Sequence, residues 1–289
     1  MEIGNTNDKK ILACVEQSRF ANSVASYAAW AAMRVGAPLE FLHVLDRHTE
    51  RGHGDDHTGA IGIDAQEHLI DKLTVEEAAR TAAAREQGRV FLHDLREQAR
   101  TAGAVAVDVR QRHGKLEETL AEQEIDVRLL VLGHGGSAAV DTSLGGNVER
   151  VVRTLHVPVL IVPDRFERPQ RALIAFDGGT AAKRAVDMVA TSPVFEQVTI
   201  LLFMADQGSP RTSSELASAE EVLQAAGREV HVMLKPGKVA DNVAAIVRDH
   251  AIDIVVMGAF GHSALRNLIF GSKTAELLRS IKVPTLLLR

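Results

Sequence analysis

The chain repeats itself, since five short segments of its first half return in the same order in its second half. The outer pairs are residues 10–16 with 172–177, and residues 153–162 with 279–288. The inner pairs are residues 39–46 with 198–206, 105–116 with 229–239, and 126–133 with 253–258. Ordered matches of this kind indicate two copies of one structural unit.

Each half has the pattern of a doubly wound α/β domain. Short runs rich in Val, Ile and Leu alternate with longer stretches at helical period, which is typical of a parallel sheet covered by helices on both faces. We therefore expect two Rossmann-like domains, each with a five-stranded parallel sheet. Residues 164–169 are polar and end at a Pro, so they are the expected linker between domains at 1–164 and 169–289.

Helix signals fit this frame. The first helix is predicted over residues 21–35, with Gly36 ending it. A long helix is predicted over residues 74–102, with Val90 among its inward residues, and residues 47–62 should form an exposed loop. The counterpart of the long helix opens with the capping box that begins at Thr212.

The last strand of each half should join the two domains. Residues 158–162 and 284–288 are apolar runs that each follow a Pro start, and an uncovered apolar edge is an aggregation hazard. Pairing these two edges inside one chain removes the hazard. The sequence thus predicts an internal pseudo-dimer, and it leaves a homodimer and a further protein partner open.

Composition excludes several function classes. Hydrophobic residues make up 46% and charged residues 25% of the 289 residues, with a net charge of −5 and no basic stripe, so nucleic acid is not an expected partner. No apolar run approaches the ~20 residues that span a bilayer, and the N-terminus lacks a secretory signal pattern. The one cysteine, Cys14, fits a reducing compartment. We expect a cytoplasmic protein.

The second half carries a glycine motif after its fourth strand. Gly258 and Gly261 are followed by a spacer of nine residues and then by a segment that opens a helix, Gly271-Ser272-Lys273-Thr274. Glycine lets the backbone approach a phosphate, and free N–H groups at a helix start favour an anion. Asp177, which closes the first strand of this half, could accept from an adenine amine or a ribose hydroxyl.

The spacing Gly-x2-Gly-x9-Gly-Ser resembles the ATP-binding signature of the universal stress protein family, and the repeated halves resemble its tandem members. The resemblance implies that Asp177 and the main chain near Met204 hold the adenosine of ATP, with or without Mg²⁺. It implies that Gly258 and Gly261 flank the ligand. It assigns the phosphates to Gly271, Ser272, Lys273 and Thr274.

The first half departs from the signature. Its counterpart residues for a weaker second site are Glu16, Val44, Gly133, Gly136, Gly145 and Gly146. With Gly145 as the third glycine the spacer has eight residues and Gly146 replaces the hydroxyl residue. With Gly146 as the third glycine the spacer is nine, and Asn147 takes that place. We expect the second half to be the main site.

The resemblance implies a stress-response protein regulated by ATP, with no catalytic residues and no metal site. A ligand-free dimerisation scaffold, a slow ATP hydrolase and an adenylating enzyme are the alternatives. His48, His53 and His57 lack a zinc spacing and are expected in a solvated loop. His262 and Ser263 are chain neighbours without an orienting acid, which does not favour a nucleophile pair.

Overall fold

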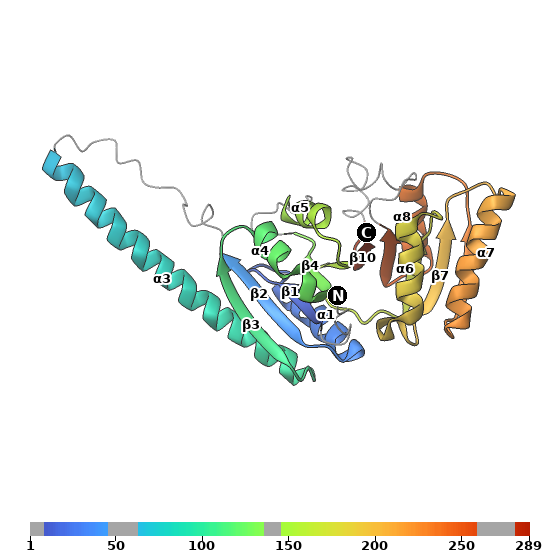
Figure 1. The fold of residues 1–289 in the computed structure, drawn as a ribbon, viewed down its shortest axis with the longest axis horizontal. Helices are drawn as coiled ribbons and strands as arrows, with labels where there is room; N and C mark the ends of the chain where they lie inside the picture. Colours follow the sequence, from blue (N-terminus) through green and yellow to red (C-terminus); the bar gives the residue numbers. More distant parts are fainter. Residues whose placement is uncertain (1–8, 46–62, 136–145, 259–280) are drawn as a thin grey trace, which may run out of the picture.

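The computed structural model describes residues 9–45, 63–135, 146–258 and 281–289 (Figure 1). The first half contains β1 (Lys10–Cys14), α1 (Ala21–Val35), β2 (Leu39–Leu45), α3 (Ile63–Thr101), β3 (Val107–His113), α4 (Leu116–Gln123), η2 (Glu124–Asp126), β4 (Val127–Gly133), α5 (Gly146–Thr154) and β5 (Val159–Val162). The second half contains β6 (Arg171–Ala175), α6 (Thr180–Thr191), η3 (Pro193–Phe195), β7 (Thr199–Met204), α7 (Pro210–Ala225), β8 (Val230–Leu234), α8 (Val239–Asp249), β9 (Ile254–Gly258) and β10 (Thr285–Leu288).

The strands form one ten-stranded sheet in the order β3-β2-β1-β4-β5-β10-β9-β6-β7-β8. Within each half all neighbouring strands are parallel, which confirms two five-stranded Rossmann-like units. The inner strands β4 and β9 are apolar except for Arg128 near the start of β4, because helices cover both faces of the sheet.

The predicted joint between the halves is confirmed. β5 and β10 pair antiparallel, with Leu160 opposite Leu286 and Val159 opposite Leu287. Each of the two apolar layers, one on either face of the sheet, contains residues of both halves. The pseudo-dimer therefore has a continuous core.

Side chains of α1 reinforce the joint. The hydroxyl of Tyr27 donates to the carbonyl of Glu167 at 3.1 Å and accepts the Glu167 N–H at 3.2 Å. The ring of Tyr27 meets that of Phe166 edge to face at 4.7 Å between centroids. Arg34 donates to the carbonyl of Glu196, beyond η3, at 2.6 Å. The contacts of Tyr27 fix the segment between the halves against the first helix, and the contact of Arg34 ties that helix to the second half.

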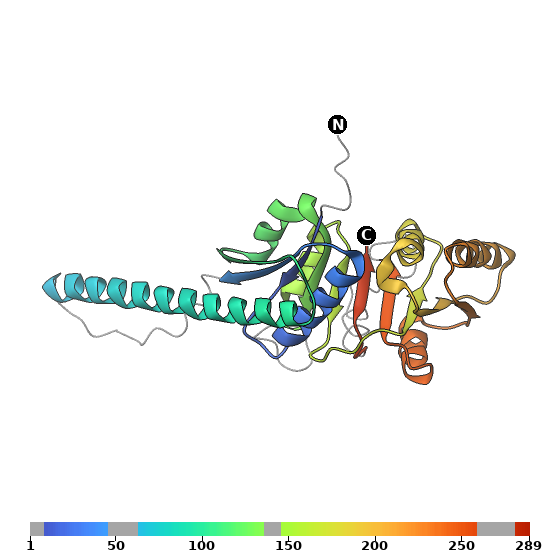
Figure 2. The ribbon, with the colours of Figure 1, turned by 90° about the horizontal axis from the view of Figure 1, so that it is seen from below.

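The predicted helix bounds are partly right. α1 runs over Ala21–Val35 and ends at Gly36, whose φ of 65° is left-handed, as expected. α3 starts earlier than predicted, and Figures 1 and 2 show its first turns projecting beyond the sheet. Val90 is 46% exposed, so its predicted inward orientation is wrong.

The start of α7 also differs from the prediction. Ser209, rather than Thr212, is the N-cap, because its Oγ accepts the Thr212 N–H and Pro210 occupies the first helical turn. A proline there supplies a helical φ and lacks only an N–H that has no partner within the helix.

Candidate functional site

The second half has its topological switch point between β6 and β9. β6 pairs with β7 on one side and with β9 on the other, so the chain leaves β6 in one direction and returns on the opposite side. Ligands of open α/β sheets bind beyond the carboxyl ends of strands at such a point. Asp177 follows β6 and Gly258 ends β9, so the fold brings these two predicted residues to the same place.

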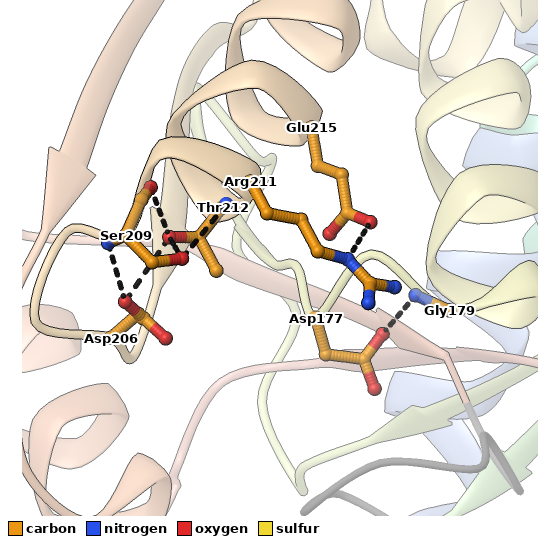
Figure 3. Close-up of polar contacts among 7 residues, drawn as sticks. All are labelled: Asp177, Gly179, Asp206, Ser209, Arg211, Thr212 and Glu215. Atoms are coloured by element: carbon orange, nitrogen blue, oxygen red, sulfur yellow. Dashed lines mark hydrogen bonds and ion pairs between the residues drawn. The ribbon is translucent and has the colours of Figure 1, made fainter.

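Asp177 shapes the turn between β6 and α6. Its Oδ1 accepts the N–H of Gly179 at 2.9 Å (Figure 3), and Gly179 is the N-cap of α6. Gly178 between them has a φ of 74°, a left-handed conformation that favours glycine. The carboxylate is thereby fixed beside the first turn of α6.

The nearby end of α7 places an ion pair against this turn. A Cβ on Gly178 would lie within van der Waals overlap of the Glu215 carboxylate, which therefore rests directly on the glycine. Arg211 donates through Nε to Glu215 Oε1 at 3.2 Å (Figure 3). Sequence reasoning missed both residues, because their helical spacing of four is common on solvated surfaces and nothing in it indicates Gly178.

Asp206 organises the turn between β7 and α7 (Figure 3). Its Oδ1 accepts the N–H groups of Gly208 at 2.8 Å and Ser209 at 3.3 Å and the Thr212 hydroxyl at 3.1 Å. The backbone N–H groups of Gly208 and Ser209 lower the pKa of the Asp206 carboxyl. The carboxylate thus orders the segment that positions Arg211.

Gly258 has a packing reason of its own. A Cβ at this position would lie 2.7 Å from the backbone nitrogen of Ala182 and 2.8 Å from the carbonyl carbon of Ala181. Gly258, the first glycine of the motif, therefore lets α6 approach the end of β9. This close approach accounts for the glycine without a ligand, although it is compatible with one.

The backbone direction at the end of β7 bears on the predicted adenosine contact. The carbonyl of Met204 accepts the Lys235 N–H at 3.2 Å, so it is directed toward β8, whereas the Phe203 carbonyl accepts the Phe176 N–H beside β6. Because backbone groups alternate along a strand, the next groups on the β6 side belong to Ala205. The main chain near Met204 that faces Asp177 is that of Ala205.

The remaining predicted residues of this half lie outside the described residues. They are Gly261, Gly271, Ser272, Lys273 and Thr274, together with the neighbours His262 and Ser263. Their assignment stays a prediction from sequence.

The first half repeats the arrangement at the switch point between β1 and β4. Glu16 follows β1, and its carbonyl accepts the Ser18 N–H at 2.7 Å. A Cβ on Gly133, at the end of β4, would lie 2.8 Å from Phe20 Cβ, so this glycine also admits the start of a helix. Val44 lies near the end of β2, in the position that corresponds to Ala205.

Of the remaining predicted residues of the first-half site, the structure describes only one. Gly146 is the first residue of α5, whereas Gly136 and Gly145 lie outside the described residues. The helix that follows the motif is thus present in the first half.

Cys14, at the end of β1, is a half-buried thiol packed against the core. Burial raises its pKa, and the nearby carboxylates of Glu40 and Glu16 raise it further. A thiol of this kind stays protonated, and protonation makes it a poor nucleophile.

Within residues 9–45, 63–135, 146–258 and 281–289, no group of three His, Cys, Asp or Glu residues is arranged to hold a metal ion. His48, His53 and His57, which the sequence predicts in a loop, fall outside these ranges. No helix in the described part of the chain combines the length and the apolar character that a membrane crossing requires.

The fold and the two switch points define a class of protein: a tandem chain of two Rossmann-like domains. In each domain a glycine ends the fourth strand beside the acidic residue that follows the first strand. The model of the universal stress protein family matches residues 8–163 and again residues 169–289. The chain therefore belongs to the universal stress protein family, as a tandem member.

Relatives match this chain over nearly its full length. The universal stress protein Slr1230 of Synechocystis is 29% identical over 97% of this chain and 100% of its own length. The crystal structure of a universal stress protein from Archaeoglobus fulgidus matches with a TM-score of 0.71 at 20% identity, covering 98% of this chain and 97% of that one. Protein PA1789 of Pseudomonas aeruginosa, described as functionally unknown, matches with a TM-score of 0.57 at 18% identity. It covers 98% of this chain and 93% of that one.

Proposed function

We propose that this universal stress protein binds ATP in its second half and acts as a nucleotide-dependent regulator rather than as a fast enzyme. The observation that carries the proposal is the meeting of Asp177 and Gly258 at one switch point, from segments far apart in sequence. The motif that begins at Gly258 supplies the glycines and hydroxyls for the phosphates.

The division of labour follows from the described geometry. Asp177, held by Gly179, and the main chain of Ala205 would contact the adenosine. Gly261, Gly271, Ser272, Lys273 and Thr274 would contact the phosphates through backbone N–H groups and hydroxyls. We propose domains at 1–164 and 169–289, which agree with the two matches of the family model.

A regulatory role fits the carboxylates near the switch point better than catalysis does. Phosphoryl transfer needs acids that hold metal ions and a group that orients the attacking water. Here Asp177 accepts from the backbone, Asp206 orders a turn, and Glu215 pairs with Arg211. These acids have structural partners at the adenosine end.

Thermal unfolding with and without ATP and Mg²⁺ tests the proposal. A ligand that binds only the folded state at a hundredfold excess over Kd adds about 2.7 kcal/mol. Gly261→Val should abolish the shift, and Ser272→Ala should weaken binding by roughly 1.5–3 kcal/mol through loss of a charge-assisted hydrogen bond. If millimolar ATP leaves the wild-type melting temperature unchanged, the chain is a ligand-free scaffold instead.

An assay for phosphate release separates the regulator from a hydrolase. We expect binding without turnover on the timescale of a typical enzyme. Multiple turnovers per second would overturn the regulatory assignment while leaving ATP binding intact.

A further inference from the structure

The two outer edges of the ten-stranded sheet differ in chemistry. β3, at one end, carries Asp108, Arg110 and Arg112, and α3 packs on it. β8, at the other end, contains no Asp, Glu, Lys or Arg, and its His231 lies 3.4 Å from the Glu229 carboxylate. Val232 and Leu234 are 41% and 36% exposed. Charges along an edge discourage pairing with another strand, and an uncharged apolar edge invites it. Among the described residues, no strand pairs with the outer side of β8.

The hydrogen bonds between β7 and β8 fix which backbone groups of β8 face outward. The Glu229 carbonyl accepts the Ile200 N–H, and the Lys235 N–H donates to the Met204 carbonyl, so both residues face β7. By the alternation of backbone groups, Val230, Val232 and Leu234 point their N–H and C=O groups away from the sheet. These residues form a ready antiparallel hydrogen-bonding row.

This edge is complementary to itself. An antiparallel register centred on Val232 sets Val232 opposite its own copy and Val230 opposite Leu234, all as hydrogen-bonded pairs. The same register sets Glu229 opposite Lys235 at both ends of the contact. Shifting the centre by one residue keeps the hydrogen bonds in phase but loses this match of acid and base, so one register is favoured.

We propose that β8 pairs with β8 of a second copy of this chain about a two-fold axis, extending the sheet across the dimer. The joint between β5 and β10 is an internal precedent for antiparallel pairing of edge strands in this fold. The inference is independent of nucleotide binding.

Charge reversal tests both the surface and its register. We expect sedimentation velocity at low salt to show a reversible dimer of the full chain. Glu229→Lys and Lys235→Glu, tested singly, should each weaken association about tenfold, because each places like charges opposite one another twice per dimer. The double variant E229K/K235E restores the pairing and should restore the dimer. The control is Asp108→Lys on β3, which changes the charge by the same amount as Glu229→Lys and should leave association unchanged.

Val232→Pro is a second, independent test of pairing at the outer edge of β8. It removes an N–H that has no role inside the sheet, and proline is tolerated on edge strands, so the chain should stay folded by circular dichroism and become monomeric. A wild-type chain that is monomeric up to its solubility limit overturns the proposal. A dimer that ignores both the charge variants and Val232→Pro also overturns it, because the interface then lies elsewhere. If Val232→Pro does not fold, the charge set decides alone.

Discussion

Gly258 shows how one residue can meet two demands. Sequence reasoning assigned it to the side of a ligand, and the structure adds that α6 leaves no room for a side chain there. Gly133 has the same relation to the start of α1 in the first half. A glycine in this motif can therefore be required for helix packing even in the half whose phosphate residues depart from the signature.

Gly258→Ala should lower the free energy of unfolding by about 1–3 kcal/mol in the absence of nucleotide, because the new methyl group overlaps backbone atoms of α6. Urea denaturation of the ligand-free protein measures it. Ser213→Ala, on the exposed side of α7, is the control and should stay within about 0.5 kcal/mol of wild type. Unchanged stability of Gly258→Ala would mean that the glycine serves a ligand alone.

Tyr27 provides a titration that reports on the joint. Burial raises its pKa from 10.0 to about 12, and it is the one tyrosine of the chain. The folded protein thus keeps this proton where the unfolded chain has lost it, so stability should fall as pH rises from about 10 to about 12. Tyrosinate absorbance should show the raised midpoint in buffer and an ordinary one in denaturant, with Tyr27→Phe as the blank. An ordinary midpoint in the folded protein would contradict the burial of the Tyr27 hydroxyl.

At the scale of elements, the sequence predicted the strands, their parallel order within each half and the joint between β5 and β10. The spacing of apolar residues and the short apolar runs are enough to predict these features, because both are read from local sequence. They do not fix which face of a long helix is buried. Among the described positions of α3 the buried ones are Gly88, Leu92, Leu95 and Ala99, and Val90 lies outside this stripe. The contact of Glu215 with Gly178 was also out of reach, because it depends on how α7 lies over the turn after β6.

Charged substitutions at the joint between β5 and β10 should strongly lower the free energy of unfolding. Leu160 and Leu287 are 2% and 3% exposed, so Leu160→Lys with Leu287→Lys should cost on the order of 3–5 kcal/mol or more, by burying unpaired charge between the halves. Leu287→Met is the control and should cost less than about 1.5 kcal/mol. Chemical denaturation followed by Trp30 fluorescence measures both variants. The Trp30 ring centroid lies 6.2 Å from that of Tyr27, at the joint. Cooperative and unchanged unfolding of the double variant would show that the halves are held together elsewhere.

For the whole molecule, the shared core makes the tandem chain a single folding unit with two unequal candidate sites. Both switch points share the acid, the glycine and the helix start, and they differ in the hydroxyls that follow. The structure does not describe those hydroxyls, so the difference between the sites rests on sequence.

Isothermal titration of the intact chain should therefore give close to one ATP per chain. Gly271→Val should remove the binding by placing a branched side chain where the phosphate approaches, and the matched Gly145→Val should leave it largely intact. A stoichiometry near two, or loss of binding through Gly145→Val alone, would assign competence to backbone N–H groups in the first half.

The antiparallel joint has a geometric consequence for such a molecule. Strands of the first half all run toward one long border of the sheet, and those of the second half run toward the opposite border. The two switch points thus open on opposite sides. A ligand bound at one switch point therefore lies at the opposite border of the sheet from a ligand bound at the other, and each can be occupied without contact with the other.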